Sequence, residues 1–338
     1  MNIILLSGGS GKRLWPLSND IRSKQFIKFF KNDDGVQESM IQRIYRQIKK
    51  IDKKANIVVA NSSSQAELIH EQLENEIQIS LEPSRKGTFC AIALATMYLK
   101  DVLHLDENES VVVCPIDAHV GKDYFECIKF IYERIATQTS ANLVMMGIEP
   151  TYPSDKYGYI IPKTKNKVSS VSMFKEKPSV DVAKKYIEQG ALYNGGITAF
   201  KLKYVIDLAH KLIDFVDYHD LYKKYNSLKT ISFEYEIAEH EKNIEVVRFN
   251  GKWEDVGTWE TLTDSLESNI IGNGMIDDTS KNVSIINELG IPVLAMGLKD
   301  VVIALSPDGI LVADKKQSSN IKPFVEKLSQ QNNNFCDK

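Results

Sequence analysis

A glycine cluster next to basic residues stands near the amino terminus and has the composition of a phosphate-binding segment. The letters SGGSGKR cover residues 7–13 and directly follow the apolar run of residues 3–6. An apolar strand that runs into a glycine-rich turn presents backbone N–H groups to an anion. The segment therefore predicts a phosphate site, with Arg13 and the nearby Lys24 as candidate cations.

Two familiar phosphate-binding motifs do not match this segment. The Walker loop needs a Ser or Thr after its lysine, whereas Lys12 is followed by Arg13. The dinucleotide fingerprint needs a third glycine where Leu14 stands. We therefore expect a phosphate site of another kind.

Two aspartates follow apolar runs and could hold a metal ion. Asp117 comes after the run of residues 110–114, and Asp255 follows the strand-like residues 244–249 and precedes Gly257. In open α/β sheets ligands bind outside the carboxyl ends of the strands. Magnesium takes one or two protein carboxylates and completes its shell with phosphate oxygens and water. Each aspartate taken alone could instead be a helix cap or a turn residue, so only the combination predicts a magnesium-bound polyphosphate.

The elements that would position these residues alternate along the chain. Apolar runs at 3–6, 57–60, 110–117 and 142–149 predict buried parallel strands. Helical periodicity occupies residues 37–50, 64–76, 88–100 and 122–137. This alternation predicts an α/β fold with a Rossmann-like, mostly parallel sheet and helices on both faces.

The character of the sequence changes near residue 269. Short β-branched pieces broken by Gly, Asn and Asp follow, with a helix expected over residues 321–329 and disorder over residues 331–338. We therefore expect one domain over residues 1–268 and a small β-rich domain over residues 269–338.

Composition restricts the class of partner. The net charge of −3 gives no reason to expect nucleic acid or an anionic membrane. No apolar run approaches membrane-spanning length, and the chain begins with a strand instead of a signal peptide. The four cysteines show no metal-ligand spacing, and Cys90, Cys114 and Cys127 are expected to be reduced thiols in apolar surroundings. These features predict a cytoplasmic protein.

Nine motifs occur in an order that resembles one enzyme family. They are GGSGKRLWPLS, KQF, LEPSRKGT, CPIDAHV, KYGYI, FKEKPS, YNGGITAF, SFEYEIAE and KWEDVGTW. The chain resembles the sugar-phosphate nucleotidyltransferases, most of all the mannose-1-phosphate guanylyltransferases in their short form without an isomerase module. The resemblance implies a GT-A-like fold, a C-terminal domain like a left-handed β-helix, and a homodimer. It also implies GTP and a sugar 1-phosphate as partners and Mg²⁺ or another divalent cation as cofactor.

The resemblance also implies a role for each motif residue. Arg13, Lys24, Asp117 and Asp255 would be catalytic, and the two aspartates would share the metal. The implied nucleotide-binding residues are Leu6, Ser7, Gly8, Gly9, Ser10, Gly11, Lys12, Arg13, Glu82, Pro83, Thr88 and Asp117, with Glu82 near the base. The implied sugar-phosphate residues are Lys24, Tyr157, Gly158, Tyr159, Glu176, Lys177, Asn194 and Gly196.

Several positions depart from the family pattern and leave the sugar open. Tyr193 and Gly195 stand where tryptophan and serine are usual, and Ala118 separates Asp117 from His119. The first expected reaction is transfer of GMP from GTP to mannose 1-phosphate. The alternatives are another sugar such as a manno-heptose 1-phosphate, or a catalytically inactive protein that binds nucleotide sugars. A glycosyltransferase is disfavoured because we find no Asp-x-Asp motif.

Overall fold

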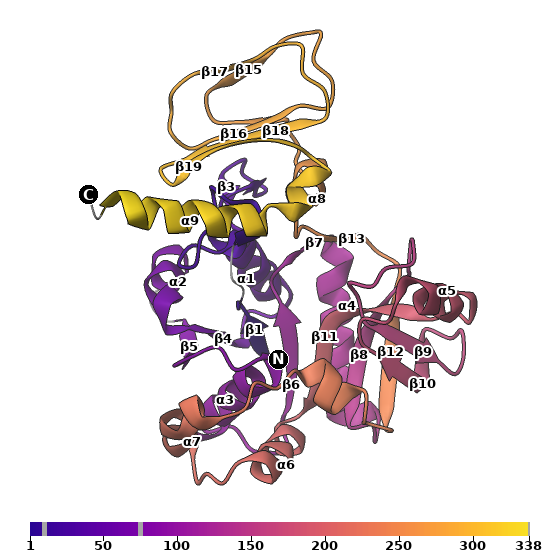
Figure 1. Cartoon of the computed structure of the whole chain (residues 1–338). Coiled ribbons are helices and arrows are strands. Elements are labelled where there is room, and N and C mark those ends of the chain that lie inside the picture. The colour runs from indigo at the N-terminus through magenta and orange to yellow at the C-terminus, as the bar shows by residue number, and fades with distance from the viewer. Residues whose placement is uncertain (9–11, 74–76, 337–338) are drawn as a thin grey trace. The chain divides into compact units, whose positions relative to one another are not determined.

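The computed structural model describes residues 1–8, 12–73 and 77–336, which form two compact units (Figure 1). The first, here called the sheet unit, comprises Met1–Gly8, Tyr45–Ile116 and Val120–Trp253. The second, here called the coil unit, comprises Gly9–Ile44, Asp117–His119 and Glu254–Lys338. The predicted domain boundary at residue 268 stays a prediction.

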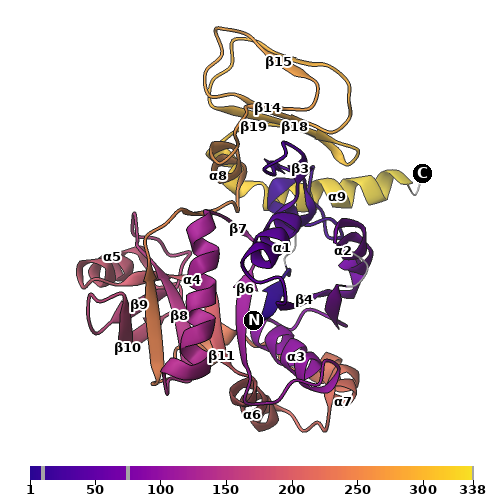
Figure 2. The ribbon, with the colours of Figure 1, turned by 180° about the vertical axis from the view of Figure 1, so that it is seen from behind.

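The sheet unit is built on a nine-stranded sheet in the order β5-β4-β1-β6-β11-β8-β12-β10-β9 (Figure 1). Figure 2 shows the ribbon from behind. Its strands are β1 (Asn2–Leu6), β4 (Asn56–Ser62), β5 (Gln78–Glu82), β6 (Ser110–Pro115), β8 (Leu143–Ile148), β9 (Tyr159–Pro162), β10 (Val168–Lys175), β11 (Leu192–Lys201) and β12 (Ile244–Phe249). The pairs β1–β4, β1–β6 and β4–β5 are parallel, and so is β8–β12. The four apolar runs are therefore strands, as predicted.

The sheet is mixed, and the expectation of a mostly parallel sheet is corrected in its second half. Strand β11 lies between β6 and β8 and runs antiparallel to both, and β9 and β10 are antiparallel to their neighbours. The sequence of β11 concealed it because Gly195 and Gly196 interrupt its apolar pattern. The register between Asn194 and Thr198 shifts there, and Gly196 has a φ of +78°.

The four predicted helices form with shifted ends. They are α1 (Met40–Ile51, which starts in the coil unit), α2 (Ala66–Gln72), α3 (Thr88–Asp101) and α4 (Lys122–Glu133). The sheet unit also contains three helices that were not predicted, α5 (Val180–Glu188), α6 (Leu202–Leu212) and α7 (Tyr218–Lys224). Helix α1 begins later than predicted because Ser39 and Gln42 form a reciprocal capping pair, which starts the helix after Ser39. Of the helix predicted over residues 64–76, positions 74–76 lie outside the described residues.

The core of the sheet unit is apolar, and α3 supplies much of it. Leu94, Ala95 and Leu99 on this helix are fully buried and belong to one cluster with Ile4 and Val58 of the sheet. Cys90 on the same helix and Cys127 on α4 are free thiols, and burial raises the pKa of each to about 11. Such groups stay protonated and unreactive at neutral pH.

The C-terminal part of the coil unit is β-rich, as predicted. Its strands are β14 (Ile270–Ile271), β15 (Gly274–Ile276), β16 (Ser284–Asn287), β17 (Val293–Ala295), β18 (Val301–Ser306) and β19 (Gly309–Asp314). β14, β16 and β18 pair in parallel, and so do β15 and β17, so successive coils stack as in a β-helix. The left-handed sense stays a prediction.

An apolar cluster joins the amino-terminal segment of the coil unit to its C-terminal strands. Leu17 and Phe29 pack in one buried group with Trp259, Ile286 and Val302. Trp259 begins α8 (Trp259–Asp264) and is fully buried. Residues far apart in the sequence therefore share one core.

The C-terminal helix is longer than expected. Helix α9 runs over Lys322–Cys336, whereas the sequence predicts a helix over residues 321–329 and disorder beyond residue 330. Residues 331–336 continue the helix because no Gly or Pro interrupts it after Pro323. Within the described residues, no helix has the length and hydropathy needed to cross a membrane.

Candidate active site

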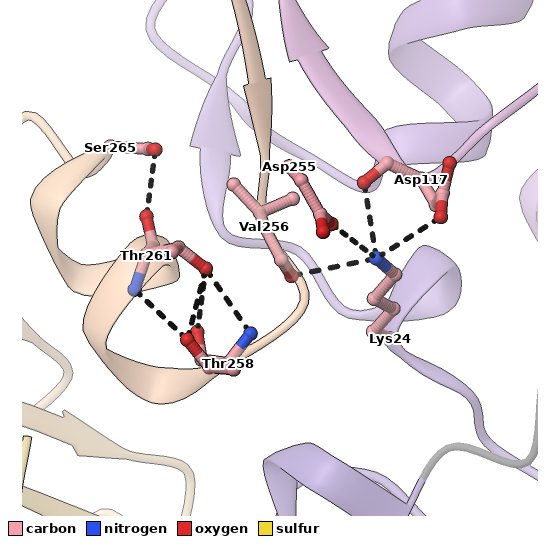
Figure 3. Close-up of polar contacts among 7 residues, drawn as sticks. All are labelled: Lys24, Asp117, Asp255, Val256, Thr258, Thr261 and Ser265. Atoms are coloured by element: carbon pink, nitrogen blue, oxygen red, sulfur yellow. Dashed lines mark hydrogen bonds and ion pairs between the residues drawn. The ribbon is translucent and has the colours of Figure 1, made fainter. Parts of the chain in front are cut away.

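Three of the four predicted catalytic residues meet in the coil unit (Figure 3). Lys24 opens a 3₁₀ turn (Lys24–Phe26), Asp117 directly precedes β7 (Ala118–Val120), and Asp255 ends β13 (Trp253–Asp255). The Lys24 ammonium lies 3.6 Å from Asp117 Oδ2 and 3.9 Å from Asp255 Oδ1. Residues separated by 93 and 231 positions in the chain thus share one polar centre.

Two backbone oxygens complete the surroundings of the same ammonium. Lys24 Nζ donates to the carbonyl of Asp117 at 3.1 Å and to that of Val256 at 3.5 Å. Two carboxylates and two carbonyls therefore surround one nitrogen, and we call these four groups the oxygen cage. A set of hard oxygen donors is what Mg²⁺ prefers in proteins.

The donor set fits a metal ion that a substrate completes. The described part of the chain holds no group of three or more His, Cys, Asp or Glu side chains placed to bind a metal on their own. Asp117 and Asp255 supply two carboxylates, which is the usual protein share at a magnesium–phosphate site. The remaining ligands would come from phosphate oxygens and water.

Arg13 reaches the turn that carries Asp255. A Cβ atom at Gly257 would lie 3.0 Å from Asp255 Oδ1 and 3.3 Å from Arg13 Nη1. Glycine therefore leaves room for the carboxylate and the guanidinium to face the same point. All four predicted catalytic residues belong to the coil unit.

A helix cap fixes the turn after Asp255. Thr258 precedes α8, and its hydroxyl accepts from the Thr261 backbone N–H at 3.3 Å, while Thr261 Oγ1 accepts from the Thr258 N–H at 3.2 Å (Figure 3). This reciprocal cap removes freedom from the backbone that presents Val256 to Lys24. The indole of Trp259 donates to the carbonyl of Trp15 at 3.1 Å and holds the turn to the amino-terminal segment.

A second polar pair links the two strands that carry the aspartates. His119 on β7 lies 3.2 Å from Glu254 on β13, and the Ser265 hydroxyl donates to the same carboxylate oxygen at 3.1 Å. The His119 ring also stacks on Phe30 at 4.6 Å. His119 therefore has a packing role, and Glu254 is a structural neighbour that the sequence did not single out.

The glycine segment is described only at its edges. Leu6 ends β1, and the Ser7 N–H donates to the Ala60 carbonyl at 3.0 Å. Ser7 Oγ accepts from Asn61 at 3.2 Å. Gly9, Ser10 and Gly11 lie outside the described residues, as does the side chain of Lys12.

In the sheet unit, Glu82 is tied to a tyrosine that the sequence did not single out. Glu82 ends β5 and is 8% exposed, and its Oε2 accepts from the Tyr225 hydroxyl at 2.6 Å. Burial raises the pKa of Glu82 above its usual value, although the Tyr225 hydrogen bond opposes the shift. A backbone hydrogen bond from Lys86 also reaches this carboxylate, so it is already held by protein donors.

The residues that follow Glu82 form a rigid junction. Gly87 has a φ of +88°, and a Cβ atom there would lie 2.3 Å from the Ile231 carbonyl oxygen. Thr88 begins α3, and its hydroxyl donates to Glu234 at 2.9 Å and accepts from the Phe233 N–H at 2.8 Å. The side chain of Thr88, predicted to bind nucleotide, is thus engaged in holding this junction.

Gly158, Glu176 and Asn194, all predicted sugar-phosphate residues, form a tight cluster in the sheet unit. A Cβ atom at Gly158 would lie 2.3 Å from Glu176 Oε2 and 3.2 Å from Asn194 Cβ. The Asn194 N–H donates to the Gly158 carbonyl at 2.8 Å, and Asn194 Oδ1 accepts from the Gly196 N–H at 3.0 Å. Glycine at position 158 is therefore required by close packing.

Glu176 presents a buried oxygen that has no hydrogen-bond donor among the described residues. The side chain is 7% exposed, Oε1 lies 3.1 Å from Lys177 Nζ, and Oε2 is buried without a partner. Burial raises the pKa of Glu176, against the effect of Lys177. A buried acceptor without a donor is costly.

Tyr157, Tyr159 and Tyr193 lie in this region and differ in their burial and in the partners of their hydroxyl groups. Tyr159 is fully buried and its hydroxyl exchanges hydrogen bonds with the backbone of Ser154. Tyr193 is 3% exposed, with its hydroxyl bonded to the Tyr152 backbone. Tyr157 is half-buried, with ring centroids 4.8 Å from Tyr193 and 5.7 Å from Trp253. Of these tyrosines, Tyr157 has the face most available to a ligand.

Glu239 anchors the backbone of the Glu176–Lys177 pair. Its Oε1 accepts from the Glu176 N–H at 2.8 Å, and its Oε2 accepts from Lys175 Nζ at 2.9 Å. Burial opposes ionisation, yet these hydrogen bonds hold the pKa of Glu239 below its usual value. Lys177 has a φ of +44°, a conformation that needs such support. In the sequence, Glu239 is the last residue of the motif SFEYEIAE, but the motif did not assign a role to it.

Comparison with known proteins places the chain in a family. Residues 2–269 match the Nucleotidyl transferase family. The mannose-1-phosphate guanylyltransferase of Escherichia coli is 31% identical over 96% of this chain and 75% of its own length. That of Salmonella montevideo is 29% identical over 97% and 74%.

A solved structure has the same fold. The crystal structure of mannose-1-phosphate geranyltransferase from Thermus thermophilus superposes with a TM-score of 0.80 at 24% identity, covering 97% of this chain and 98% of the other. The mixed sheet and the β-rich C-terminal region are thus shared. The chain belongs to the nucleotidyl transferase family and is an enzyme, a sugar-phosphate nucleotidyltransferase.

Proposed function

We propose that this enzyme transfers GMP from GTP to α-D-mannose 1-phosphate and releases diphosphate, forming GDP-mannose. The observation that carries the proposal is the meeting of Lys24, Asp117 and Asp255 in one oxygen cage. In a displacement at phosphorus, negative charge accumulates on the phosphate oxygens. A lysine and two carboxylates that could hold a metal ion would together stabilise that charge. The name of the E. coli relative supports guanine and mannose as the specific partners.

The proposed mechanism is in-line attack by the sugar phosphate on the α-phosphorus. The attacking phosphate oxygen is already an anion, so no general base is needed. Arg13 would bind the β- and γ-phosphates that leave, and Lys24 would lie between the α-phosphate and the attacking phosphate. Asp117 and Asp255 would hold Mg²⁺, which supplies charge neutralisation at the reacting phosphates. Catalysis is then positioning and electrostatic stabilisation.

The sheet unit supplies the proposed sugar-phosphate residues. The unpartnered Oε2 of Glu176 would accept from a sugar hydroxyl, and Lys177 would bind the phosphate. The compact turn at Gly158 would let the sugar approach the backbone. Tyr157 would pack on the ring of the sugar, while Tyr159, Asn194 and Gly196 would shape the site.

A substrate panel tests the proposal. The four nucleoside triphosphates are crossed with mannose, glucose and manno-heptose 1-phosphates in the presence of Mg²⁺, and diphosphate release is measured. We expect the highest kcat/KM for GTP with mannose 1-phosphate. Preference for a heptose 1-phosphate would assign another sugar. Binding of GDP-mannose without turnover on any pair would identify an inactive nucleotide-sugar-binding protein.

Base selection gives a prediction at Glu82. If Glu82 accepts from the N–H groups of guanine, the wild-type enzyme should favour GTP over ATP by about a hundredfold or more in kcat/KM, because adenine does not present to the carboxylate the ring N–H that guanine presents beside its amino group. Glu82→Gln should narrow this ratio, since an amide can donate as well as accept. Tyr225→Phe should also narrow it, because the hydroxyl at 2.6 Å orients the carboxylate.

The control for base selection is Tyr98→Phe. The Tyr98 hydroxyl donates to Gln78 at 2.8 Å, at the opposite end of β5. This variant loses the same chemical group and should keep the GTP-to-ATP ratio. An unchanged ratio in Glu82→Gln would move base recognition to another part of the site, most simply the backbone of residues 8–11.

The Glu239 anchor gives a prediction for the sugar phosphate. Glu239→Ala frees the Glu176 N–H and Lys175, so Glu176 and Lys177 lose their fixed backbone. We expect the KM for the sugar 1-phosphate to rise about tenfold, with the KM for GTP unchanged. Glu239→Gln keeps an acceptor for the Glu176 N–H and should restore most of the loss.

Glu241→Ala is the matched control. Glu241 also accepts several hydrogen bonds, including that of Tyr204 at 2.7 Å and of the Asn243 N–H at 2.7 Å, but it does not contact Glu176 or Lys177 through any described bond. Glu241→Ala should lower the melting temperature and leave the KM values for GTP and for the sugar 1-phosphate unchanged. An equal rise in sugar-phosphate KM in the two variants would reduce Glu239 to a general stabilising role.

A further inference from the structure

We propose that Lys24 is the resident counter-ion of Asp117 and Asp255 in the metal-free enzyme, and that a divalent cation displaces its ammonium from the oxygen cage. Lys24 would then be released toward the phosphates only when the metal has bound. The inference rests on the proposed metal site and adds an order of events to it: the lysine and the metal exchange places.

The contacts of Lys24 show what holds it before the exchange. Its ammonium lies between 3.1 and 3.9 Å from four oxygens, those of the oxygen cage (Figure 3). All four oxygens belong to the protein, so the ammonium that is assigned to the phosphates also has the protein's own carboxylates as partners.

Electrostatics makes joint occupancy of the cage unfavourable. A divalent ion bound by Asp117 Oδ2 and Asp255 Oδ1 would lie within a few ångströms of an ammonium that both oxygens also contact. Like charges at that separation repel strongly. If both cations contacted the two carboxylates, each cation would be bound more weakly than it would be alone. The metal and the ammonium therefore compete for the two carboxylates.

The local structure lets the side chain move while the backbone remains fixed. Gln25 and Phe26 next to Lys24 are 3% and 1% exposed, so the 3₁₀ turn is anchored in the coil unit. The lysine side chain is partly accessible, and its four-carbon stem has several rotamers.

Metal binding without nucleotide provides the first test. Mn²⁺ binding to the full chain is measured by electron paramagnetic resonance for the wild type, Lys24→Met and Lys28→Met. Methionine keeps much of the length of lysine and removes its charge. We expect Lys24→Met to bind Mn²⁺ about tenfold more tightly than the wild type, because the competing ammonium is gone. Lys28 is exposed four residues further on, and Lys28→Met should leave binding unchanged, which controls for net charge.

A second pair of variants separates this inference from the proposed metal site. Asp255→Asn in the Lys24→Met background should abolish the gain. Equal Mn²⁺ affinity of wild type and Lys24→Met, with weaker binding in Asp255→Asn, would overturn the exchange and retain the metal site. Mn²⁺ binding that is insensitive to Asp255→Asn in both backgrounds would overturn the metal site itself.

Chemical labelling of the wild-type protein is an independent measurement that needs no variant. Modification of Lys24 by an amine-reactive reagent is followed by mass spectrometry with and without Mg²⁺. We expect Mg²⁺ to raise labelling of Lys24 severalfold, since the ammonium leaves the oxygen cage, and to leave Lys28 unchanged. Equal or lower labelling of Lys24 with Mg²⁺ would show that the lysine stays with the aspartates and would overturn the exchange.

Discussion

Replacing Asp255 by asparagine is expected to lower kcat by about a thousandfold or more while the protein stays folded. The amide keeps the size of the side chain but removes the negative charge that would hold the metal ion at the reacting phosphates. Asp255 ends β13 at the edge of a turn and is partly exposed, so we expect the fold to tolerate the loss of its charge. Diphosphate release and thermal unfolding measure the two effects separately.

Asp264→Asn is the control for this prediction. Asp264 ends α8, nine residues further on, and its side chain is exposed. This variant makes the same chemical change outside the oxygen cage and should turn over at the wild-type rate. Near-normal turnover of Asp255→Asn would refute the assignment of both carboxylates to one metal. Asp117→Asn should behave like Asp255→Asn, because both contact the same ammonium.

The second large effect is expected at Lys24 and Arg13. Lys24→Ala and Arg13→Ala should each lower kcat about a hundredfold or more and change the KM for GTP only a few-fold. Both charges are most effective when negative charge builds on the phosphates in the transition state, so their loss affects turnover more than binding. Steady-state kinetics with saturating sugar phosphate distinguishes the two constants.

Lys28→Ala is the matched control for the lysine. It removes an exposed ammonium from the same segment and should leave kcat unchanged. A Lys24→Ala enzyme with normal kcat and a raised KM for GTP would make Lys24 a ground-state binding residue. The metal exchange adds a further signature: the variant that loses turnover should gain affinity for Mn²⁺.

Much of the coil-unit site was predictable from the sequence. The position of Lys24 between the two reacting phosphates stays a prediction, and its distances of 3.6 and 3.9 Å from Asp117 and Asp255 are a finding of the structure. Asp117 was predicted to follow the apolar run of residues 110–114, and it does follow β6. Asp255 was predicted to follow residues 244–249, and it does follow β12. Such predictions succeed because apolar runs locate strands, and strands dictate where the following polar residues emerge.

Other features could not be derived because they depend on pairs far apart in the chain. Tyr225 meets Glu82 across 143 positions, and Glu239 meets Glu176 across 63. No periodicity or spacing in the sequence predicts the contact of Tyr225 or that of Glu239. The burial that raises the pKa of Glu82 likewise exists only after the chain has packed.

Local patterns of apolar and polar side chains were enough to predict the α/β class, the positions of the first strands and the polar residues at their ends. Tertiary contacts were needed to show that β11 enters the sheet antiparallel and that four protein oxygens surround the partly accessible ammonium of Lys24. Sheet order and ion pairing depend on which distant segments come into contact, and one chain's local sequence does not encode that choice in any single stretch.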